Sequence, residues 1–178
     1  MRDIFNRLPF AAIISERIFV VHAGLSQDLD SMERLGGLMR PTHVPLDGWF
    51  SEFLWSNPSE DIIGWAKNDR DRRDSLIYIG PDVVSNFLKQ HDLDLICRAH
   101  EMVKGGYELF AEKQLVTIYS VPRYHPESDP GAGAVMHVDE SLSYSVQKFR
   151  PIGPQLEISK DSPGQGFAEW VESVTSKL

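Results

Sequence analysis

The sequence predicts a mixed fold in which short strands pair as hairpins and a few helices pack against them. Three observations predict it: short apolar runs that come in pairs, apolar residues at helical spacing after a proline, and a composition with 42% hydrophobic and 25% charged residues, as in ordinary globular domains. With 178 residues the chain is long enough for one domain with a sizeable core. This pattern fits both the α/β and the α+β class, and it indicates no function.

The N-terminal half begins with two short apolar runs, Ala11–Ser15 and Ile18–His22, which predict two strands or a hairpin. Residues 31–40 and Trp49–Trp55 each predict a short helix, the first of them stopped by a proline. Residues 56–73 are polar, so we expect irregular structure there.

The C-terminal half predicts one helix followed by strands. Pro81–His91 has proline at the start of a helix and apolar residues at helical spacing. A buried strand is then expected, followed by two strand pairs: Leu93–Cys97, Tyr107–Phe110 with Leu115–Ser120, and Ala132–Val138 with Leu142–Lys148. Residues 121–130 predict a long loop, and 152–178 a flexible tail.

Charge and cysteine content narrow the classes of partner. The net charge of −8 argues against nucleic acid or an anionic membrane as the main partner, since both favour basic surfaces. Cys97 is the single cysteine, so no intrachain disulfide can form, and we expect an intracellular protein of the cytoplasm or nucleus. The sequence contains neither a membrane-spanning apolar run nor the apolar region of a signal peptide.

Two histidines stand at the ends of predicted strands. His22 follows an apolar run and precedes a glycine turn, and His100 follows a second apolar run. A ligand at the end of a buried strand is rigid and can still point into a cleft, which suits a metal site. The alternative is that each histidine is satisfied by a backbone hydrogen bond, since the two are not spaced as a ligand pair on a helix or knuckle.

Three further residues are candidates for contacting a phosphate. Arg98 lies two residues before His100, so on a strand both would face the same way, and a guanidinium can donate two hydrogen bonds to an oxyanion. Arg70 is a second cation, although it stands in a charge cluster that solvent alone can explain. Tyr124 lies on the long loop, either as a ligand contact or as an ordinary loop aromatic. Cys97 is interpreted as a small buried hydrophobe.

Taken together, these segments resemble one family from about Phe5 to about Pro151. The matching motifs occur in order along the chain: Phe19–Ser26, Met39–Thr42 with Val44-Pro45, Leu54–Ser56, Gly64-Trp65, Asn68–Arg70, His91–His100, Gly106–Glu108, Gln114–Thr117, Gly133–Met136 and Val138–Glu140. They are similar to the metal-dependent phosphoprotein phosphatases, and most of all to the type-1 serine/threonine branch. The resemblance implies the α/β calcineurin-like metallophosphoesterase fold, a central β-sandwich flanked by helices, with residues 1–151 as its C-terminal half.

The resemblance also implies an activity and a site. The family hydrolyses phosphoserine and phosphothreonine esters in phosphoproteins with two divalent metal ions, for which manganese, iron or zinc are expected. Carried over, His22 and His100 are ligands of one metal ion and should therefore lie close together in space. Arg70 and Tyr124 contact the phosphate or gate access to it, and Arg98 supports the site beside His100.

The chain departs from the family pattern in what it lacks. The family's motifs Gly-Asp-x-His-Gly, Gly-Asp-x-x-Asp-Arg-Gly and Gly-Asn-His-Glu, which supply the other metal ligands, do not occur here. Asn57 replaces an acid, and in the loop over the site Arg123 replaces an asparagine and His125 a cysteine, so the response to the family's toxin inhibitors is in doubt. We therefore expect the chain by itself to be inactive and poorly soluble, with the strands Ile18–Val21 and Leu93–Cys97 exposed to water.

Two functions remain open. The first is a fragment of an active phosphatase, and the second is a catalytically dead module that docks regulatory subunits through a hydrophobic groove. The residues corresponding to that groove are Ile18, Asp94, Leu95, Leu109, Leu142 and Tyr144. Their ordinary interpretation is that the apolar ones are core or strand-face residues. In-frame copies of the three missing motifs upstream of Met1 would favour the first function.

Overall fold

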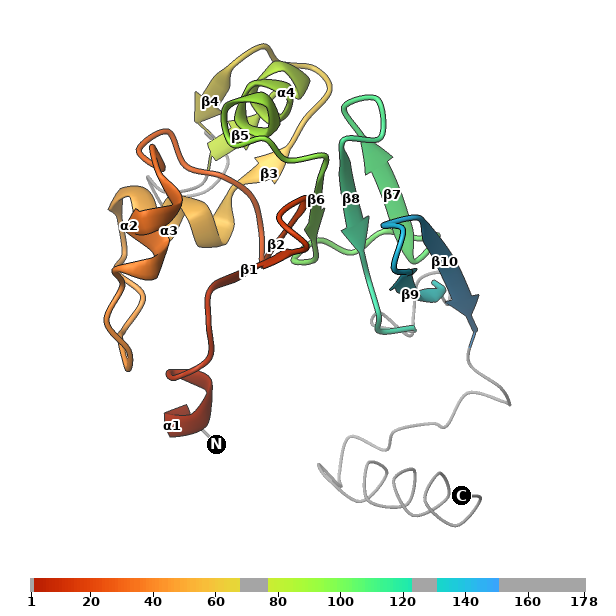
Figure 1. The fold of residues 1–178 in the computed structure, drawn as a ribbon, viewed down its shortest axis with the longest axis horizontal. Helices are drawn as coiled ribbons and strands as arrows, with labels where there is room; N and C mark the ends of the chain where they lie inside the picture. Colours follow the sequence, from red (N-terminus) through yellow and green to blue (C-terminus); the bar gives the residue numbers. More distant parts are fainter. Residues whose placement is uncertain (1, 68–76, 123–130, 151–178) are drawn as a thin grey trace, which may run out of the picture.

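The computed structural model describes residues 2–67, 77–122 and 131–150. Its centre is a five-stranded sheet in the order β1-β2-β6-β8-β7 (Figure 1). The strands are β1 (Ala11–Ile14), β2 (Ile18–Val21), β6 (Leu95–Arg98), β8 (Leu115–Ile118) and β7 (Tyr107–Phe110). The inner strands β2, β6 and β8 are parallel, whereas β1 and β7 are antiparallel to their neighbours. The predicted hairpins at β1–β2 and β7–β8 are confirmed.

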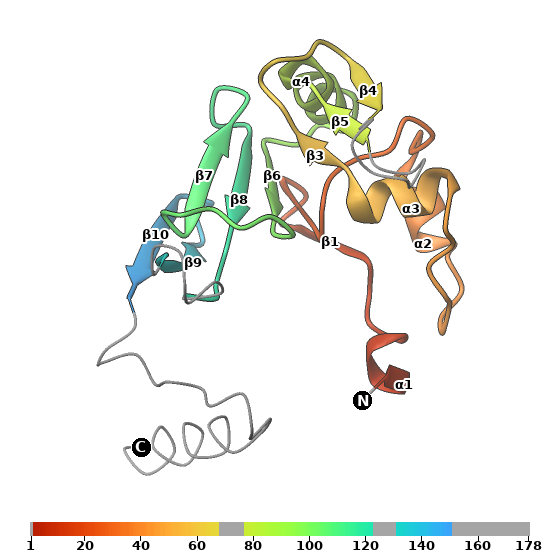
Figure 2. The same cartoon turned by 180° about the vertical axis from the view of Figure 1, so that it is seen from behind.

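Two smaller sheets complete the strands. One has the order β3-β5-β4, built from β3 (Asn57–Pro58), β5 (Ile77–Ile79) and β4 (Trp65–Lys67). The other is the predicted antiparallel pair of β9 (Gly133–Val138) and β10 (Tyr144–Phe149). Both views place β9 and β10 beside β7 and β8, on the opposite side of the molecule from α2 and α3 (Figure 2). The expectation of irregular structure over 56–73 is wrong at β3 and β4, because their few residues carry too little pattern to be recognised.

Four helices are present in the described chain: α1 (Arg2–Phe5), α2 (Met32–Gly36), α3 (Gly48–Trp55) and α4 (Pro81–Gln90). Helix α4 begins with proline at its first turn, as predicted, and buries one side, consisting of Val83, Val84, Phe87 and Leu88. None of the helices in the described part of the chain is long and apolar enough to cross a membrane.

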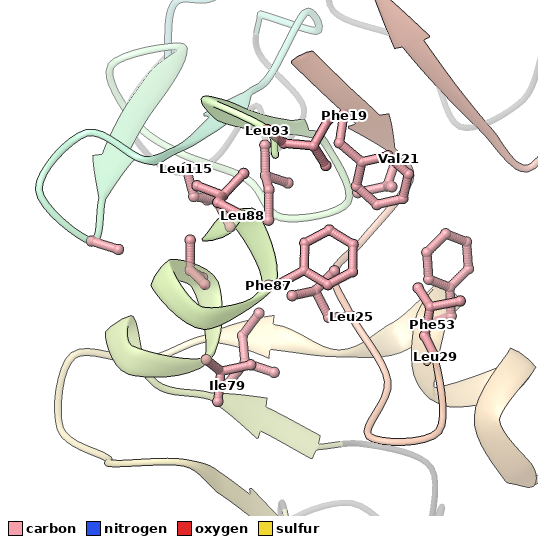
Figure 3. Close-up of a cluster of buried hydrophobic side chains, with 14 of the residues drawn as sticks. Phe19, Val21, Leu25, Leu29, Phe53, Ile79, Phe87, Leu88, Leu93 and Leu115 are labelled. Atoms are coloured by element: carbon pink, nitrogen blue, oxygen red, sulfur yellow. The ribbon is translucent and has the colours of Figure 1, made fainter. Parts of the chain in front are cut away.

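The main core lies between the five-stranded sheet and the helices. Figure 3 shows Phe19 and Val21 of β2 near Phe87 and Leu88 of α4. The rings of Phe19 and Phe87 have centroids 5.3 Å apart. Because side chains alternate along a strand, Phe19 and Val21 enter this core while Ile18 points to the other face.

On that other face, a smaller cluster buries Ile18, Leu95 and Val116. The expectation that Ile18–Val21 and Leu93–Cys97 meet water is therefore wrong: β2 and β6 are interior strands with neighbours on both sides. The edge strands are β1 and β7, and on β1 Ile13 and Ile14 are 45% and 40% exposed. An edge of this kind can pair with another chain.

Candidate active site

The structure brings the two predicted histidines together. His22 follows β2 directly, His100 lies two residues beyond the end of β6, and these strands are parallel with Val20 opposite Cys97. Parallel neighbours end at the same edge of a sheet, so residues far apart in sequence meet there. His100 Nδ1 and His22 Nε2 are 3.2 Å apart, and the two rings meet edge to face with centroids 5.0 Å apart.

The backbone holds both histidines at this edge. The Ala99 N–H donates to the His22 carbonyl at 3.1 Å, which joins the two strand ends. The Glu101 N–H donates to the Ala99 carbonyl at 2.8 Å and closes a tight turn around His100. His100 has φ of 67°, the left-handed region that a residue with a side chain occupies at a cost of about 1–3 kcal/mol. The ring of Trp55, at the end of α3, packs edge to face against His100 at 5.4 Å.

The chain after His22 approaches α3 closely, and this explains its glycine. A Cβ on Gly24 would lie 2.5 Å from Ser56 Oγ, so a side chain there would displace Ser56. The Ser56 hydroxyl donates to the Leu25 carbonyl at 2.7 Å, and the Ser26 hydroxyl donates to Glu52 Oε2 at 2.7 Å. These contacts fix the exit of the chain from β2.

The electrostatic environment favours neutral imidazole at His22. Burial lowers the pKa of His22 below its usual value, and the positive charge of Arg98 lowers the pKa further. Neutral imidazole is the form that coordinates a metal ion, because its ring nitrogen keeps a free lone pair.

Arg98 lies behind the turn rather than open to a ligand. It is 2% exposed. Its Nη1 donates to Glu101 Oε2 at 2.8 Å and to Thr117 Oγ1 at 3.4 Å, and its Nη2 donates to Asn57 Oδ1 at 2.9 Å. Burial lowers its pKa, and the contact with Glu101 opposes that shift. With these donors bound to protein oxygens, the geometry fits the supporting role beside His100 better than a phosphate contact.

Arg70 and Tyr124, the residues predicted to bind phosphate, lie outside the described residues. The same is true of Arg123, His125 and the predicted tail 152–178. Their roles stay predictions.

The histidine pair fits part of a metal site. Two nitrogens 3.2 Å apart can both bind one ion, since ligand bonds of about 2.0–2.1 Å together span more than that separation. Within the described ranges, no group of three or more His, Cys, Asp or Glu side chains is placed to hold an ion. Among the described residues, His22 and His100 are therefore two candidate ligands for one ion.

The residues predicted to dock regulators do not form one open surface. Ile18 and Leu95 are buried in the smaller cluster, and Leu109 packs against it half-buried. Leu142 is half-buried, while Asp94 and Tyr144 are exposed. Any contact with a partner in this conformation falls on the half-buried and exposed members.

Comparisons with known proteins identify the family of this chain. The model of the calcineurin-like phosphoesterase family matches residues 1–104, more than half of the chain. The chain belongs to the calcineurin-like phosphoesterase family. Among solved structures it is similar to a protein serine/threonine phosphatase from Saccharomyces cerevisiae with similarity to human phosphatase PP5, with 27% identity and a TM-score of 0.74. The match covers 86% of this chain and 50% of that one, so the chain spans half the length of the yeast phosphatase.

These findings confirm the predicted membership of the phosphoprotein phosphatases and the calcineurin-like fold. Membership of the calcineurin-like family also implies divalent metal ions. The sequence analysis identified both histidines and Arg98 but missed their contacts, namely Trp55 against His100, and Glu101 and Thr117 on Arg98. The conspicuous Leu54-Trp55-Ser56 motif was the signal for the first, while the other two carry no pattern in sequence.

Proposed function

We propose that this chain is the C-terminal half of the catalytic domain of a serine/threonine protein phosphatase, which hydrolyses phosphoserine and phosphothreonine esters. The observation that carries the proposal is the pair His22 and His100, with ring nitrogens 3.2 Å apart at the ends of two parallel strands. Membership of the calcineurin-like family and likeness to a yeast serine/threonine phosphatase support it.

In this proposal His22 and His100 together bind one of two divalent ions, manganese, iron or zinc, and residues from outside this chain complete both sites. Such ions, when bound, activate water for in-line attack and stabilise the phosphoryl oxygens. The chain's own residues orient the ligands: partial burial lowers the pKa of His22 and so favours its neutral form, and Arg98 supports the turn of His100. Arg70 and Tyr124 are proposed to bind the phosphate, and Arg70 is also proposed to stabilise the negative charge of the transition state.

The direct test is ligation of zinc by the 178-residue chain, followed by nitrogen-15 NMR of labelled histidines. We expect Zn²⁺ to shift Nε2 of His22 and Nδ1 of His100, the two nitrogens that face each other. His137, an exposed histidine on β9, is the internal control and should not shift. Unchanged resonances of His22 and His100 at saturating Zn²⁺ would contradict the metal assignment.

Activity is tested in a second experiment with manganese and a phosphoserine peptide. We expect no turnover by residues 1–178, because two imidazoles cannot hold two ions. Extension by an upstream half carrying the three missing motifs should establish hydrolysis. Turnover by the unextended chain would show that the other ligands are dispensable.

The second candidate function is an inactive module that docks regulatory subunits. The observation that favours it is the exposure of Asp94 and Tyr144 near the smaller cluster, an acid and an aromatic suited to a peptide with basic and apolar residues. Binding of such a peptide to the chain, weakened by Tyr144→Ala and by Asp94→Asn but not by Asp139→Asn in the nearby β9–β10 turn, would support it. An extended chain that binds the peptide and hydrolyses nothing would favour this function over the first.

A further inference from the structure

One buried guanidinium connects three elements behind the candidate site. Arg98 is the last residue of β6 and continues the side of the strand occupied by Ile96, which faces the main core. Its Nη2 reaches Asn57 in β3, and its Nη1 reaches Thr117 in β8 and Glu101 beyond the turn. The strand, the neighbouring small sheet and the turn are thus joined through a single side chain.

The turn from Arg98 to Glu101 carries His100 in a left-handed conformation. A residue in a strained backbone conformation persists only where the contacts around it hold that conformation. Two contacts close the turn: the Glu101 N–H bonds to the Ala99 carbonyl, and the Glu101 carboxylate bonds to Arg98. The second contact is an ion pair between residues three apart, at 2.8 Å.

Charge makes the Glu101 contact different from the others. The Arg98 side chain is 0% exposed, whereas that of Glu101 is 41% exposed. Glu101 is the carboxylate among the three acceptors, since Asn57 and Thr117 are neutral, and Arg98 Nε is buried without a hydrogen-bond partner in the described chain. Removing Glu101 leaves the buried charge with only the longer-range attraction of Glu108, and the loss of a partner from a buried pair is more costly than the loss of an exposed pair.

We propose that Glu101 and Asn57 are positioning residues: they hold Arg98 behind the turn and thereby fix the ring of His100 against that of His22. The inference rests on the proposed function, because it concerns the placement of a proposed ligand. It adds to that function the source of rigidity, a carboxylate and an amide that bind the guanidinium from two sides.

The test moves the carboxylate from one side of Arg98 to the other. Glu101→Gln removes the charge and keeps the shape, and Asn57→Asp in the same chain places a carboxylate oxygen where Asn57 Oδ1 now accepts. The matched control is Glu60→Gln, because Glu60 lines the same pocket of about 330 Å³ as Glu101 but is not among the hydrogen-bond partners of Arg98.

The first readout is amide hydrogen exchange at Ala99 and Glu101, whose N–H groups close the strand ends and the turn. The Ile96 amide, bonded to Gln114 in the same sheet, is the reference. In Glu101→Gln we expect exchange at the two turn amides to rise about 10-fold relative to Ile96, the effect of losing one charged hydrogen bond from a local opening. The Asn57→Asp/Glu101→Gln chain should return to within about 3-fold of wild type, and Glu60→Gln should not differ.

The second readout is Zn²⁺ affinity through the labelled histidines. Loss of a residue that orients a ligand weakens metal binding roughly 10–100-fold, so Glu101→Gln should bind Zn²⁺ at least about 10-fold more weakly and the double variant should recover. If wild type fails to bind Zn²⁺ through His22 and His100, the proposed function fails, and the exchange readout still decides the positioning role.

Two results would overturn the inference: no rise in exchange at Ala99 and Glu101 relative to Ile96 when Glu101→Gln is compared with wild type, or no recovery in the double variant. Should Glu101→Gln fail to fold, Arg98→Met/Glu101→Gln removes the charge and its partner together. That variant should fold again and still show fast exchange at Ala99 and Glu101. Wild-type protection of the turn in it would equally refute a role for the ion pair.

Discussion

The two faces of the five-stranded sheet differ sharply in how they are covered. One faces α4 and belongs to the main core, where Phe19 and Leu115 are almost inaccessible. The other is covered by a cluster with only Ile18, Leu95 and Val116 buried in the described part of the chain, with Met136 of β9 packed against it. The four apolar residues of β2 look alike in sequence, so the difference lies in what each face meets.

This contrast shows which face of the sheet contributes more to the stability of the chain. A face covered by a helix of the same chain gains most of its hydrophobic free energy within that chain. A face covered by a two-stranded sheet gains less, since such a pair has marginal stability alone. The predictions below compare the main-core face of the sheet with its other face and with the β9–β10 pair that covers that other face.

The largest expected difference concerns the histidines of the two regions. In an extended, active chain, His22→Ala and His100→Ala should each lower kcat/KM by about 10²–10⁴, because each removes a proposed ligand of an ion that would stabilise transition-state charge. His137→Ala in β9 is the control, since its imidazole contacts Gln147 on the exposed hairpin. Steady-state hydrolysis with metal content measured is the test, and full activity of the His100 variant would refute the role.

The next comparison uses neighbours on β2. Phe19→Ala removes a ring from the main core and should lower the free energy of unfolding by about 3–5 kcal/mol. Val20→Ala, on the other face and half-buried, should lower it by about 1 kcal/mol. Urea denaturation measures both, and equal losses would show that the two faces contribute alike.

A smaller, pH-dependent effect is expected in the turn between β9 and β10. Asp139 Oδ1 accepts from the N–H and hydroxyl of Ser141 and from the N–H of Ser143, and the hydrogen bond from the Ser141 side chain is the main cause that lowers the Asp139 pKa. A carboxylate with a lowered folded pKa stabilises the turn above its unfolded value near 3.8, and the effect is lost as pH falls through the folded pKa.

The measurement is amide exchange at Ser141 and Ser143 between pH 5 and pH 3, after correction for intrinsic rates. Protection should fall in wild type and should already be low in Asp139→Ala. The Ile96 amide of the five-stranded sheet should not follow the same titration, and parallel loss there would mean that the whole chain unfolds.

The smallest effect concerns Cys97, which packs at the smaller cluster. Burial raises the pKa of its thiol, so the reactive thiolate is scarce at neutral pH. We expect alkylation by iodoacetamide at pH 7.5 to be slow in the folded chain and to reach the rate of a model thiol in urea. A fast reaction without urea would show that this face opens readily.

Sequence predicted the longer elements well because their signals are local. Proline and apolar spacing placed α4, and paired apolar runs placed β1 with β2 and β7 with β8. The strands β3, β4 and β5 were missed, since two or three residues carry too little periodicity, and they pair through residues distant in sequence.

The same limit applied to the site. His22 and His100 were recognisable as strand-end histidines, and their motifs identified the family. That the histidines meet was expected from the family resemblance, whereas no local pattern indicates that β2 and β6 are adjacent and parallel, which is how they meet. Arg98 was predicted to face the same way as His100, but the turn after β6 separates them and leaves Arg98 buried. Long-range packing decides that geometry, which no local pattern encodes.

The parallel pairing of β2 with β6 has a consequence for the order of events during synthesis and folding. The two histidines are 78 positions apart in the sequence, so during synthesis His22 cannot contact His100 until His100 has left the ribosome. The chain between His22 and His100 must close a long loop before the two rings can meet, and the parallel pairing of strands is among the slower steps of folding. The histidine pair is therefore assembled late, and a metal ion that requires both rings would stabilise the chain only after the sheet has formed.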